Sequence, residues 1–399
     1  MGGYAGPRPG MRIAIVTDYY YPMLGGITEH VHGQARELAR RGHEVTVVTG
    51  HLLHTPPIAD QDARPHTDEG FGVVHLGVGV PLYGNASQTI HTVPAGLVLQ
   101  LRRLFKRLEV DVVHLHAPYN PSMCAIAPLA IPAAAIGVAT YHSVFAPGVL
   151  LDVFAPILRR WLGKLDAHVV VSEACIGSLA PYFPFDYRII PNGIDDRHFS
   201  PDAEPLPELR EGGKPVILFL GRFDPRNGLP TMLEAFKQVH AEHEGSVRLC
   251  VVGDGPLGNV YRRKLPERVA HDVIWAGRVD WSRPRYYASA DIHCTPCQRA
   301  SFGMVLLEAM ATGRPVVASR ISGFQLLMEH GKQGLLVSGA DDANRFAQAL
   351  LYLLDRPAER ARMGREGRIT AVTRYSWSRV AEQLEHLYTE LLGRKRRAR

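Results

Sequence analysis

The sequence is poor in several features, and each shortage excludes a class of protein. Only five of its 399 residues are cysteine, and the single C-x-x-C pair, Cys294 and Cys297, has no second pair with which to form a structural zinc site. No apolar run reaches the roughly 18 residues that a membrane-spanning helix needs. The first ten residues lack the apolar segment of a secretory signal. We therefore expect a cytoplasmic protein with reduced thiols.

Charge is also modest, with charged residues at 21% and a formal net charge of +6. No aromatic and basic platform or reading motif accompanies that charge, which argues against a nucleic-acid partner. Apolar residues make up 46% of the chain, as in ordinary globular proteins. The length is sufficient for two or three domains with large buried cores.

The two halves of the chain repeat one pattern of short apolar strands followed by helices. The first half opens with the strand 11–17, and the second half restarts with the strand 215–220. This alternation predicts two doubly wound, Rossmann-like α/β domains. We place them at residues 1–200 and 201–375, and we expect the helix and basic tail of residues 376–399 to return to the first domain. Further strands are predicted at 44–49, 110–115, 137–141, 168–171, 247–252, 273–276, 292–295 and 315–318.

The segment from Cys297 to Ser319 carries the strongest functional signal. A polar run ends in Ser301-Phe302-Gly303, and a helix that carries Glu308 follows. A glycine loop that opens a helix presents free N–H groups and the positive end of the helix dipole, which suits a phosphate. A carboxylate further along the helix can accept hydrogen bonds from ribose hydroxyls. The segment predicts a nucleotide-diphosphate pocket, although Gly303 could also be an ordinary turn residue.

Two other loops follow predicted strands and contain glycine. Gly25 and Gly26 would let a phosphate or sugar approach the backbone closely, although tight turns also use glycine. Arg222 follows the first strand of the second half, and its planar guanidinium can bind two phosphate oxygens. The alternative for Arg222 is a solvated surface side chain. Asn227, near the end of the same loop, can donate hydrogen bonds but brings no charge.

Histidines stand at the ends of two strands of the first half. His142 directly follows the strand 137–141, where it could hydrogen-bond a transferred sugar. His114 and His116 lie at the end of the strand 110–115, inside it and directly after it. We expect these two to face opposite sides of the sheet, with His116 on the acceptor side and His114 in packing, and we therefore predict no metal site.

These segments resemble the motifs of the retaining family-4 glycosyltransferases. Residues 300–308 read A-S-F-G-M-V-L-L-E, where the family pattern is E-S-F-G-x-x-x-x-E, and residues 221–228 match G-R-x-x-x-x-K-G except at Asn227. More narrowly, the chain is similar to bacterial phosphatidyl-myo-inositol mannosyltransferases from Met11 to Leu392. The segments that carry this likeness are G-G-I-T-E-H (25–30), L-H-A-P-Y-N-P-S (115–122), A-T-Y-H-S (139–143), I-P-N-G-I-D (190–195) and F-L-G-R-F-D (219–224).

The resemblance implies a GT-B fold with two Rossmann-like domains that face each other across a cleft. It also implies transfer of a hexose, with retention, from a nucleotide-diphosphate sugar to a hydroxyl of a lipid, polyprenol or other alcohol. A GDP-mannose-like donor is favoured, with no metal and no tightly bound cofactor. The residues that match catalytic positions are His142, Arg222 and Glu308. Those that match donor-binding positions are Gly25, Gly26, Arg222, Asn227, Val279, Phe302, Gly303, Met304, Val305 and Glu308.

Three residues depart from the family pattern. Asn227 replaces a lysine, Ala300 replaces a glutamate, and Trp281 stands where the mannosyltransferases carry an aspartate. Arg226 or Arg299 could supply the charge that Asn227 lacks. The first two departures leave open a different function, a catalytically impaired subunit that binds nucleotide sugars. The third puts a preference for guanine in question.

The segment 97–108 predicts an amphipathic helix. Its leucines and Phe105 fall on one face, and Arg102, Arg103, Lys106 and Arg107 fall on the other. Such a helix can lie on an anionic membrane surface, and the family carries a similar basic helix at this position. The alternative is a helix that only covers the sheet. The first reading predicts a protein bound peripherally to the inner face of the cell membrane.

Overall fold

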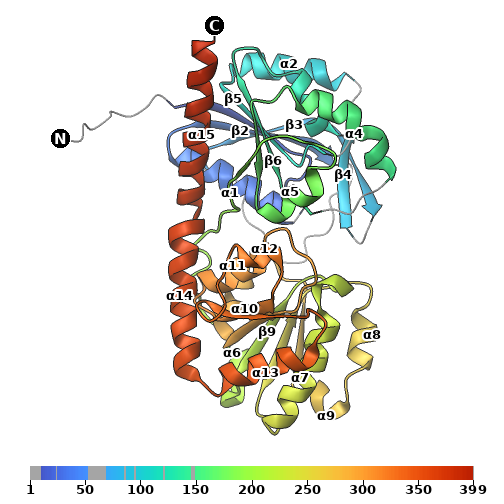
Figure 1. Ribbon diagram of the computed structural model, residues 1–399, viewed down its shortest axis with the longest axis vertical. Helices are drawn as coiled ribbons and strands as arrows, with labels where there is room; N and C mark the ends of the chain where they lie inside the picture. Colours follow the sequence, from blue (N-terminus) through green and yellow to red (C-terminus); the bar gives the residue numbers. More distant parts are fainter. Residues whose placement is uncertain are drawn as a thin grey trace, which may run out of the picture. The chain divides into compact units, whose positions relative to one another are not determined.

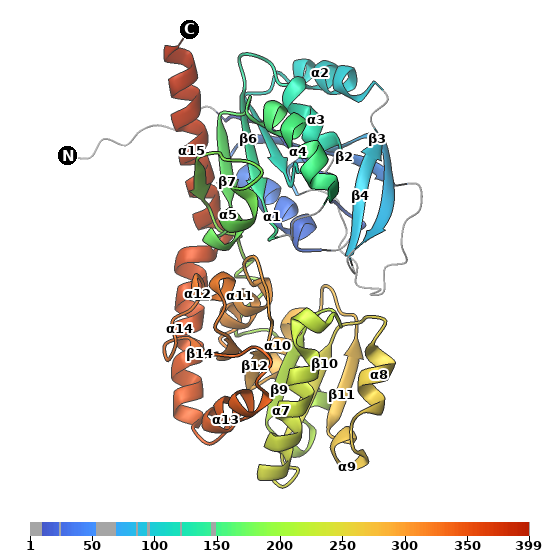
Figure 2. The ribbon, with the colours of Figure 1, turned by 45° about the vertical axis from the view of Figure 1, so that its right-hand side comes forward.

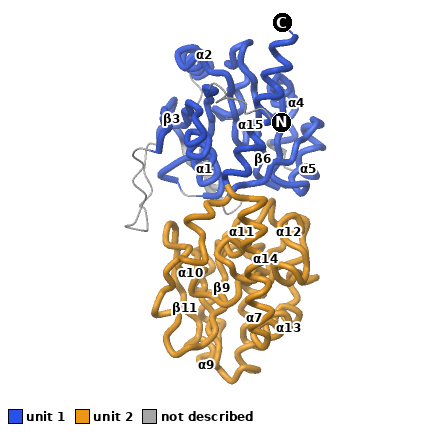
Figure 3. The backbone as a smooth tube through the Cα atoms, turned by 90° about the vertical axis from the view of Figure 1, so that its left-hand side faces the viewer, with its two compact units in different colours: residues 1–56, 65–193, 377–399 blue, residues 57–64, 194–376 orange. Residues whose placement is uncertain are grey.

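A computed structural model describes residues 10–23, 25–52, 69–84, 87–93, 96–119, 122–144 and 149–398. These residues form two compact units (Figures 1 and 3). Unit 1 contains the described residues up to Gly193 together with the segment that starts at Trp377, and unit 2 contains residues 194–376. Both are α/β units of Rossmann-like type, which confirms the predicted fold class.

The sheet of unit 1 has eight strands in the order β4-β3-β2-β1-β5-β6-β7-β8, and every neighbouring pair is parallel except β3 and β4. Strands β5 and β6 are buried along their whole length, as expected when helices cover both faces of a parallel sheet. The sequence analysis missed β3, β4 and β8. The bounds are β1 (Arg12–Val16), β2 (Glu44–Leu52), β3 (Gly72–Gly84), β4 (Ser87–Val93), β5 (Val112–His116), β6 (Ile136–Tyr141), β7 (Ala167–Val170) and β8 (Tyr187–Ile189).

Helices cover both faces of this sheet. Helix α15 (Trp377–Arg397) packs beside α1 (Gly26–Arg40). Figures 1 and 2 show α2 (Leu97–Arg107) and α4 (Val149–Leu162) on the side of unit 1 away from α15. The remaining helices of the unit are α3 (Met123–Ile126), the 3-10 turn η1 (Ala127–Leu129) and α5 (Glu173–Leu179).

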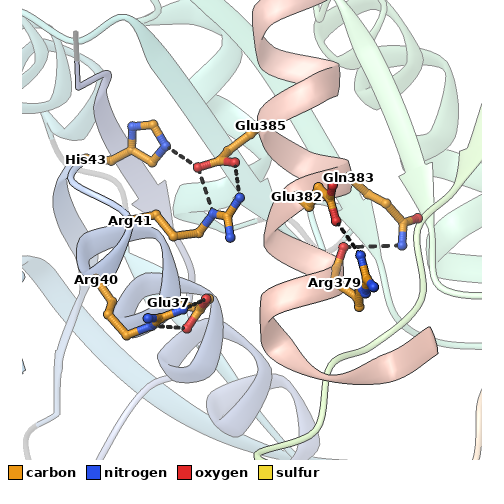
Figure 4. Close-up of polar contacts among 8 residues, drawn as sticks. All are labelled: Glu37, Arg40, Arg41, His43, Arg379, Glu382, Gln383 and Glu385. Atoms are coloured by element: carbon orange, nitrogen blue, oxygen red, sulfur yellow. Dashed lines mark hydrogen bonds and ion pairs between the residues drawn. The ribbon is translucent and has the colours of Figure 1, made fainter. Parts of the chain in front are cut away.

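Polar contacts tie α15 to the loop after α1 (Figure 4). The guanidinium of Arg41 donates two hydrogen bonds to Glu385, at 2.9 and 2.7 Å, and His43 Nε2 lies 2.8 Å from the same carboxylate. Apolar side chains of α15, among them Val380, Leu384 and Leu387, join the core that lies under α1. The end of the chain is therefore an integral part of unit 1.

The sheet of unit 2 has six strands in the order β11-β10-β9-β12-β13-β14, all parallel. The bounds are β9 (Val216–Leu220), β10 (Arg248–Val252), β11 (Val273–Gly277), β12 (Ile292–Thr295), β13 (Val316–Ser319) and β14 (Gly334–Val337). The helices are α6 (Pro207–Arg210), α7 (Leu229–Glu242), α8 (Gly258–Arg263), α9 (Glu267–Ala270), α10 (Arg283–Ser289), α11 (Met304–Ala311), α12 (Ser322–Gln325), α13 (Ala343–Leu354) and α14 (Pro357–Tyr375), with 3-10 turns η2 (Glu211–Gly213) and η3 (Pro225–Asn227).

Within the described residues, no helix is long and apolar enough to cross a membrane. The amphipathic helix predicted at 97–108 is α2. Its leucines 97, 101 and 104 and Phe105 are buried against the unit, while Arg102, Arg103, Lys106 and Arg107 are exposed. The apolar face of α2 is thus used to cover the sheet.

The start of α15 makes a close contact that predicts a stability effect. A Cβ atom on Gly33 of α1 would lie 2.2 Å from the ring of Trp377, whereas a Cβ on Gly177 of α5 would meet no described atom within 4 Å. Gly33→Ala should therefore destabilise the protein by about 1–3 kcal/mol through overpacking. Gly177→Ala should be neutral or stabilise its helix by up to about 1 kcal/mol. Urea unfolding of both variants measures the difference, and equal midpoints would show that Trp377 does not pack closely on α1.

Candidate active site

The loops after β9 and β12 meet at the carboxyl edge of the unit 2 sheet. Gly228, at the end of the first loop, has a φ of +81°, and a Cβ atom there would lie 1.9 Å from the carbonyl oxygen of Pro296. The backbone N–H of Gln298 donates to the carbonyl of Arg226 at 2.8 Å. The structure thus brings together the two segments, 221–228 and 297–303, that the sequence analysis assigned to the donor diphosphate.

In the loop after β9, two side chains form hydrogen bonds within the loop and a third is exposed. Asn227 Nδ2 donates to the carbonyl of Arg222 at 2.9 Å. Arg226 is held by Asp224, whose carboxylate accepts from Arg226 Nε at 3.0 Å. Arg222 itself is exposed. Asn227 and Arg226 therefore stabilise the shape of the loop, and Arg222 presents its guanidinium at the surface.

The loop after β12 ends in a left-handed glycine. Gly303 has a φ of +104° and precedes α11, and a Cβ atom there would lie 2.8 Å from Phe324. Phe302 is 3% exposed and packs against Tyr375, so it offers only its backbone to a ligand. Met304 and Val305 are half-buried in the first turn of α11. Ala300 packs against α12, because a Cβ on Gly323 of that helix would approach the carbonyl oxygen of Ala300 to 2.2 Å.

Glu308 is buried in α11 with both carboxylate oxygens engaged. Arg283 Nη1 lies 3.0 Å from Oε1, and the Tyr287 hydroxyl donates to Oε2 at 2.9 Å. Glu308 is only 1% exposed. Arg283 and Tyr287 orient the Glu308 carboxylate, which has four lone-pair positions for hydrogen bonds. The sequence analysis did not identify Arg283 or Tyr287.

Arg283 also connects Glu308 to the loop after β11. Its Nε donates to the carbonyl of Asp280 at 2.9 Å, and its guanidinium lies 5.6 Å from the ring centroid of Phe199. In the same loop, Trp281 stacks on His198 with ring centroids 3.6 Å apart, and Val279 is half-buried. The loop after β11 and Glu308, both of which carry predicted donor-binding positions, are therefore linked through one arginine.

In unit 1, Gly25 and Gly26 stand exposed at the start of α1. A Cβ atom on either residue would meet no described atom within 4 Å. Gly25 has an extended backbone with a φ of 171°, which any residue adopts. Packing within the described residues thus gives no reason for glycine at these two positions.

Three buried histidines converge at the carboxyl edge of the unit 1 sheet. His116 Nδ1 lies 2.9 Å from His142 Nε2, and the ring of His30, from α1, lies 4.6 Å from that of His142 between centroids. All three side chains are less than 10% exposed. The sequence analysis did not select His30, although it stands one helical turn after the Gly25-Gly26 pair.

The expectation that His114 and His116 face opposite sides of the sheet is wrong. Their rings lie 4.6 Å apart between centroids, because residues two apart on a strand share a face. His114 is buried as expected, but it is also hydrogen-bonded. Its Nε2 lies 2.7 Å from Thr140 Oγ1 and its Nδ1 lies 2.9 Å from Gln34 Nε2.

The nitrogens of His30, His116 and His142 lie within 4.8 Å of one another. Three histidines can form a zinc site, but here two of the nitrogens already hydrogen-bond each other. The absence of a metal therefore stays a prediction.

Burial determines the protonation of these histidines. It lowers the pKa of His142 to about 4 and that of His114 to about 3, and it lowers the pKa values of His30 and His116 well below their ordinary value, with neighbouring histidines adding to the effect. At neutral pH the imidazole of His142 is uncharged. It can therefore exchange hydrogen bonds with a sugar hydroxyl, but it brings no positive charge to the site.

Comparison with known proteins identifies the family. A model described as Glycosyltransferase Family 4 matches residues 24–198, and one described as Glycosyl transferases group 1 matches residues 214–356. A phosphatidyl-myo-inositol mannosyltransferase from Mycobacterium leprae is 33% identical over 383 residues, which is 95% of this chain and 96% of the relative. The chain belongs to the family-4 glycosyltransferases.

Two further comparisons concern donor and fold. A GDP-mannose-dependent alpha-(1-6)-phosphatidylinositol monomannoside mannosyltransferase from Mycobacterium tuberculosis is 28% identical and covers 94% of this chain and 97% of its own length. The solved structure of Anabaena Alr3699/HepE in complex with UDP-glucose matches with a TM-score of 0.71 at 19% identity, over 95% of this chain and 100% of that one. The likeness to solved structures shows that this glycosyltransferase has the GT-B fold.

The buried histidines predict loss of stability in acid. A histidine whose pKa is lowered by folding binds its proton more weakly in the folded state, so its stabilising contribution is complete above pH 6.5 and declines as the pH falls below that value. For His142, the decline at pH 5 is about 2 kcal/mol. Urea unfolding at pH 7.5 and 5 should therefore show a smaller acid loss in His142→Gln than in the wild type. Equal losses would mean that His142 is protonated in the native protein at pH 5.

Proposed function

We propose that this glycosyltransferase moves a mannosyl residue from GDP-mannose to a hydroxyl of a phosphatidylinositol-type lipid, with retention at the anomeric carbon. The observation that carries the proposal is the meeting of three elements at one edge of unit 2: the exposed Arg222, the amino end of α11 and the oriented carboxylate of Glu308. The names of the mycobacterial relatives support the choice of sugar, base and acceptor.

The donor diphosphate is assigned to the amino end of α11 and to Arg222. The N–H groups that follow Gly303 and the positive end of the helix dipole favour an anion. When the bond between the anomeric carbon and the diphosphate oxygen breaks, its electron pair moves to the diphosphate. Arg222 then stabilises the additional negative charge, so its effect is larger in the transition state than in the ground state.

The nucleoside is assigned to Glu308 and the loop after β11. Arg283 and Tyr287 hold the Glu308 carboxylate in one orientation, in which it accepts hydrogen bonds from the ribose hydroxyls. The base lies near Val279. Trp281 stands where the mannosyltransferases carry an aspartate. Its ring can contact a base but cannot accept hydrogen bonds from guanine as a carboxylate does. The experiment below therefore also compares donors with different bases.

The acceptor is assigned to unit 1, together with the donor contacts of Gly25, Gly26 and His142. Gly25 and Gly26 leave open space at the start of α1, where the backbone can approach a phosphate or a sugar. The neutral His142 hydrogen-bonds the transferred sugar. The new bond forms on the face that the diphosphate leaves, and the acceptor hydroxyl gives its proton to a diphosphate oxygen, so no side chain acts as a covalent nucleophile.

The membrane contact is assigned to the exposed basic face of α2. Among the described residues, none of its four cations, Arg102, Arg103, Lys106 and Arg107, pairs with a carboxylate. Four such cations attract an anionic leaflet by roughly 1 kcal/mol each. We therefore place the protein peripherally on the inner face of the cell membrane.

Incubation of the purified protein with labelled GDP-mannose, UDP-glucose or GDP-glucose and with phosphatidylinositol vesicles tests this function. We expect label in the lipid fraction from GDP-mannose, and an α-linked product by nuclear magnetic resonance. Binding of nucleotide sugars without transfer to lipid or hydrolysis would instead support the impaired binding subunit. Transfer from another donor alone would overturn the assignment of sugar or base.

Glu308→Gln should weaken nucleotide-sugar binding by roughly 1.5–3 kcal/mol, the range for hydrogen bonds to charged groups. The same change leaves the half-buried Arg283 without its carboxylate and should also destabilise unit 2, so affinity must be measured by calorimetry on protein shown to be folded. Glu329→Gln, which changes an exposed glutamate of unit 2 outside the candidate site, is the control, with unchanged affinity expected. A folded Glu308→Gln protein with wild-type affinity would exclude Glu308 from the ribose site.

Arg222→Ala should reduce the turnover rate roughly a hundredfold, the effect of removing one oxyanion donor. Arg226→Ala, on the same loop but held by Asp224, is the matched control and should reduce turnover much less. Steady-state kinetics with saturating acceptor separates the two variants. If Arg222→Ala raises only the donor concentration needed for half-maximal rate, Arg222 contributes to donor binding and does not stabilise the transition state.

A further inference from the structure

Three buried histidines of unit 1 form a group that the proposed reaction uses only in part. His30 lies one turn into α1, His116 is the last residue of β5, and His142 directly follows β6. One ring nitrogen of each lies within 4.8 Å of the other two, and among the described residues no other three metal-binding side chains lie so close together. The proposed reaction gives a ligand to His142 alone. We call these three residues the histidine cluster.

Two members of the histidine cluster carry ring nitrogens without a polar partner. His30 Nδ1 and His116 Nε2 make no hydrogen bond within the part of the chain that the structure describes. The two residues are 6% and 0% exposed, so bulk water does not reach these nitrogens freely. A buried polar atom without a partner costs free energy and therefore requires an explanation, of which a bound ion is one. The cluster thus has ligand atoms that the fold itself does not use.

The neighbours of the histidine cluster hold its rings in place. The ring of His116 lies nearly parallel to those of His114 and His142, with centroids 4.6 and 5.2 Å away. His114 is itself held by hydrogen bonds through both ring nitrogens. The ring of Trp377 packs edge-on against His30, at 5.0 Å between centroids. Such support orients the ligands of a metal site before the ion arrives.

The chemistry of the three side chains determines which ion fits. Zinc and similar transition-metal ions bind imidazole well, whereas magnesium and calcium prefer oxygen ligands such as carboxylates. No carboxylate belongs to the group among the residues that the structure describes. Three histidines, with a fourth position left to water or a substrate, are a known ligand set for zinc. The histidine cluster therefore fits zinc and does not fit magnesium.

We propose that the histidine cluster binds one zinc ion from solution, and that this ion inhibits transfer because it occupies the imidazole of His142 that the transferred sugar needs. His142 and His30 keep 9% and 6% exposure, through which the ion enters and leaves. The ion is exchangeable, so the prediction that the protein carries no resident metal is unchanged. Zinc binding rests on the cluster alone, and inhibition rests also on the proposed function.

Zinc binding is tested first on the wild-type protein, which needs no substitution. Protein stripped with a chelator and desalted is titrated with zinc chloride, and we expect saturation at one ion per chain. X-ray absorption at the zinc edge should then show three imidazole nitrogens at about 2.0–2.1 Å. Sulfur ligands at about 2.3 Å, fewer than three imidazoles, or no saturable binding would overturn the proposal.

Substitutions within the histidine cluster locate the ion. His30→Gln and His116→Gln each remove one ligand and should weaken zinc binding by more than about tenfold. His386→Gln, which changes an exposed histidine of α15, is the control and should bind zinc like the wild type. Circular dichroism and the urea midpoint show whether each variant is folded, and if neither cluster variant folds, the zinc-edge spectrum of the wild type decides. Wild-type affinity in a folded cluster variant would overturn the assigned location.

Activity tests the inhibitory role. The rate of sugar transfer by the wild type should fall as zinc saturates the histidine cluster and should return when a chelator removes the ion. Magnesium at the same concentration should not inhibit. His30→Gln, a change outside the residues assigned to the reaction, should lose much less of its rate at a zinc concentration that saturates only the wild type. Equal fractional inhibition of the two folded proteins at that concentration would overturn inhibition through the cluster.

The same measurements separate this inference from the proposed function. Zinc held by three imidazoles with an unchanged transfer rate would overturn the inhibitory role and leave the proposed function intact. If the wild type transfers no sugar from any donor, the proposed function fails and the inhibitory role fails with it. The titration and the zinc-edge spectrum then still decide whether the histidine cluster is a zinc site.

Discussion

The ion pair between the buried Glu308 and the half-buried Arg283 organises the candidate donor site of unit 2. A carboxylate that is 1% exposed is stable in its charged form only with close partners. Arg283 meets this need and at the same time holds the carbonyl of Asp280 and lies over Phe199. Helix α11, the loop after β11 and the segment that enters unit 2 are thereby connected through one side chain. If the pair is lost, the positions assigned to the ribose and the base lose their common support.

Close backbone contacts complete the same edge. Gly228 meets Pro296, and Gly323 meets Ala300, each at a distance that leaves no room for a side chain. Asn227 stands where the family pattern has a lysine, and Arg226 precedes it. Both side chains form hydrogen bonds within the loop. The loss of that lysine thus changes the charge of the site while the loop keeps internal hydrogen bonds, and Arg222 remains as an exposed cation on it.

The sequence predicted that the segments of the candidate site follow strands, because a parallel sheet places the carboxyl ends of its strands at one edge. It did not reveal their partners. Arg283 and Tyr287 reach Glu308 from 25 and 21 residues away, and His30 reaches His142 from another element, so no local pattern marks them. Strand β3 was missed because its glycines and proline are typical of loops, and the faces of His114 and His116 were assigned against the two-residue period of a strand.

The central claim is that the loops at the carboxyl edge of unit 2 bind a nucleotide-diphosphate sugar. Hydrogen exchange measured by mass spectrometry, with and without saturating GDP-mannose, tests it most directly, because bound ligand protects the amides that it contacts. We predict slower exchange in residues 221–228, 277–283 and 298–308, and little change in helices α13 and α14. Protection confined to other segments, or no protection with any nucleotide sugar that the protein binds, would contradict the account.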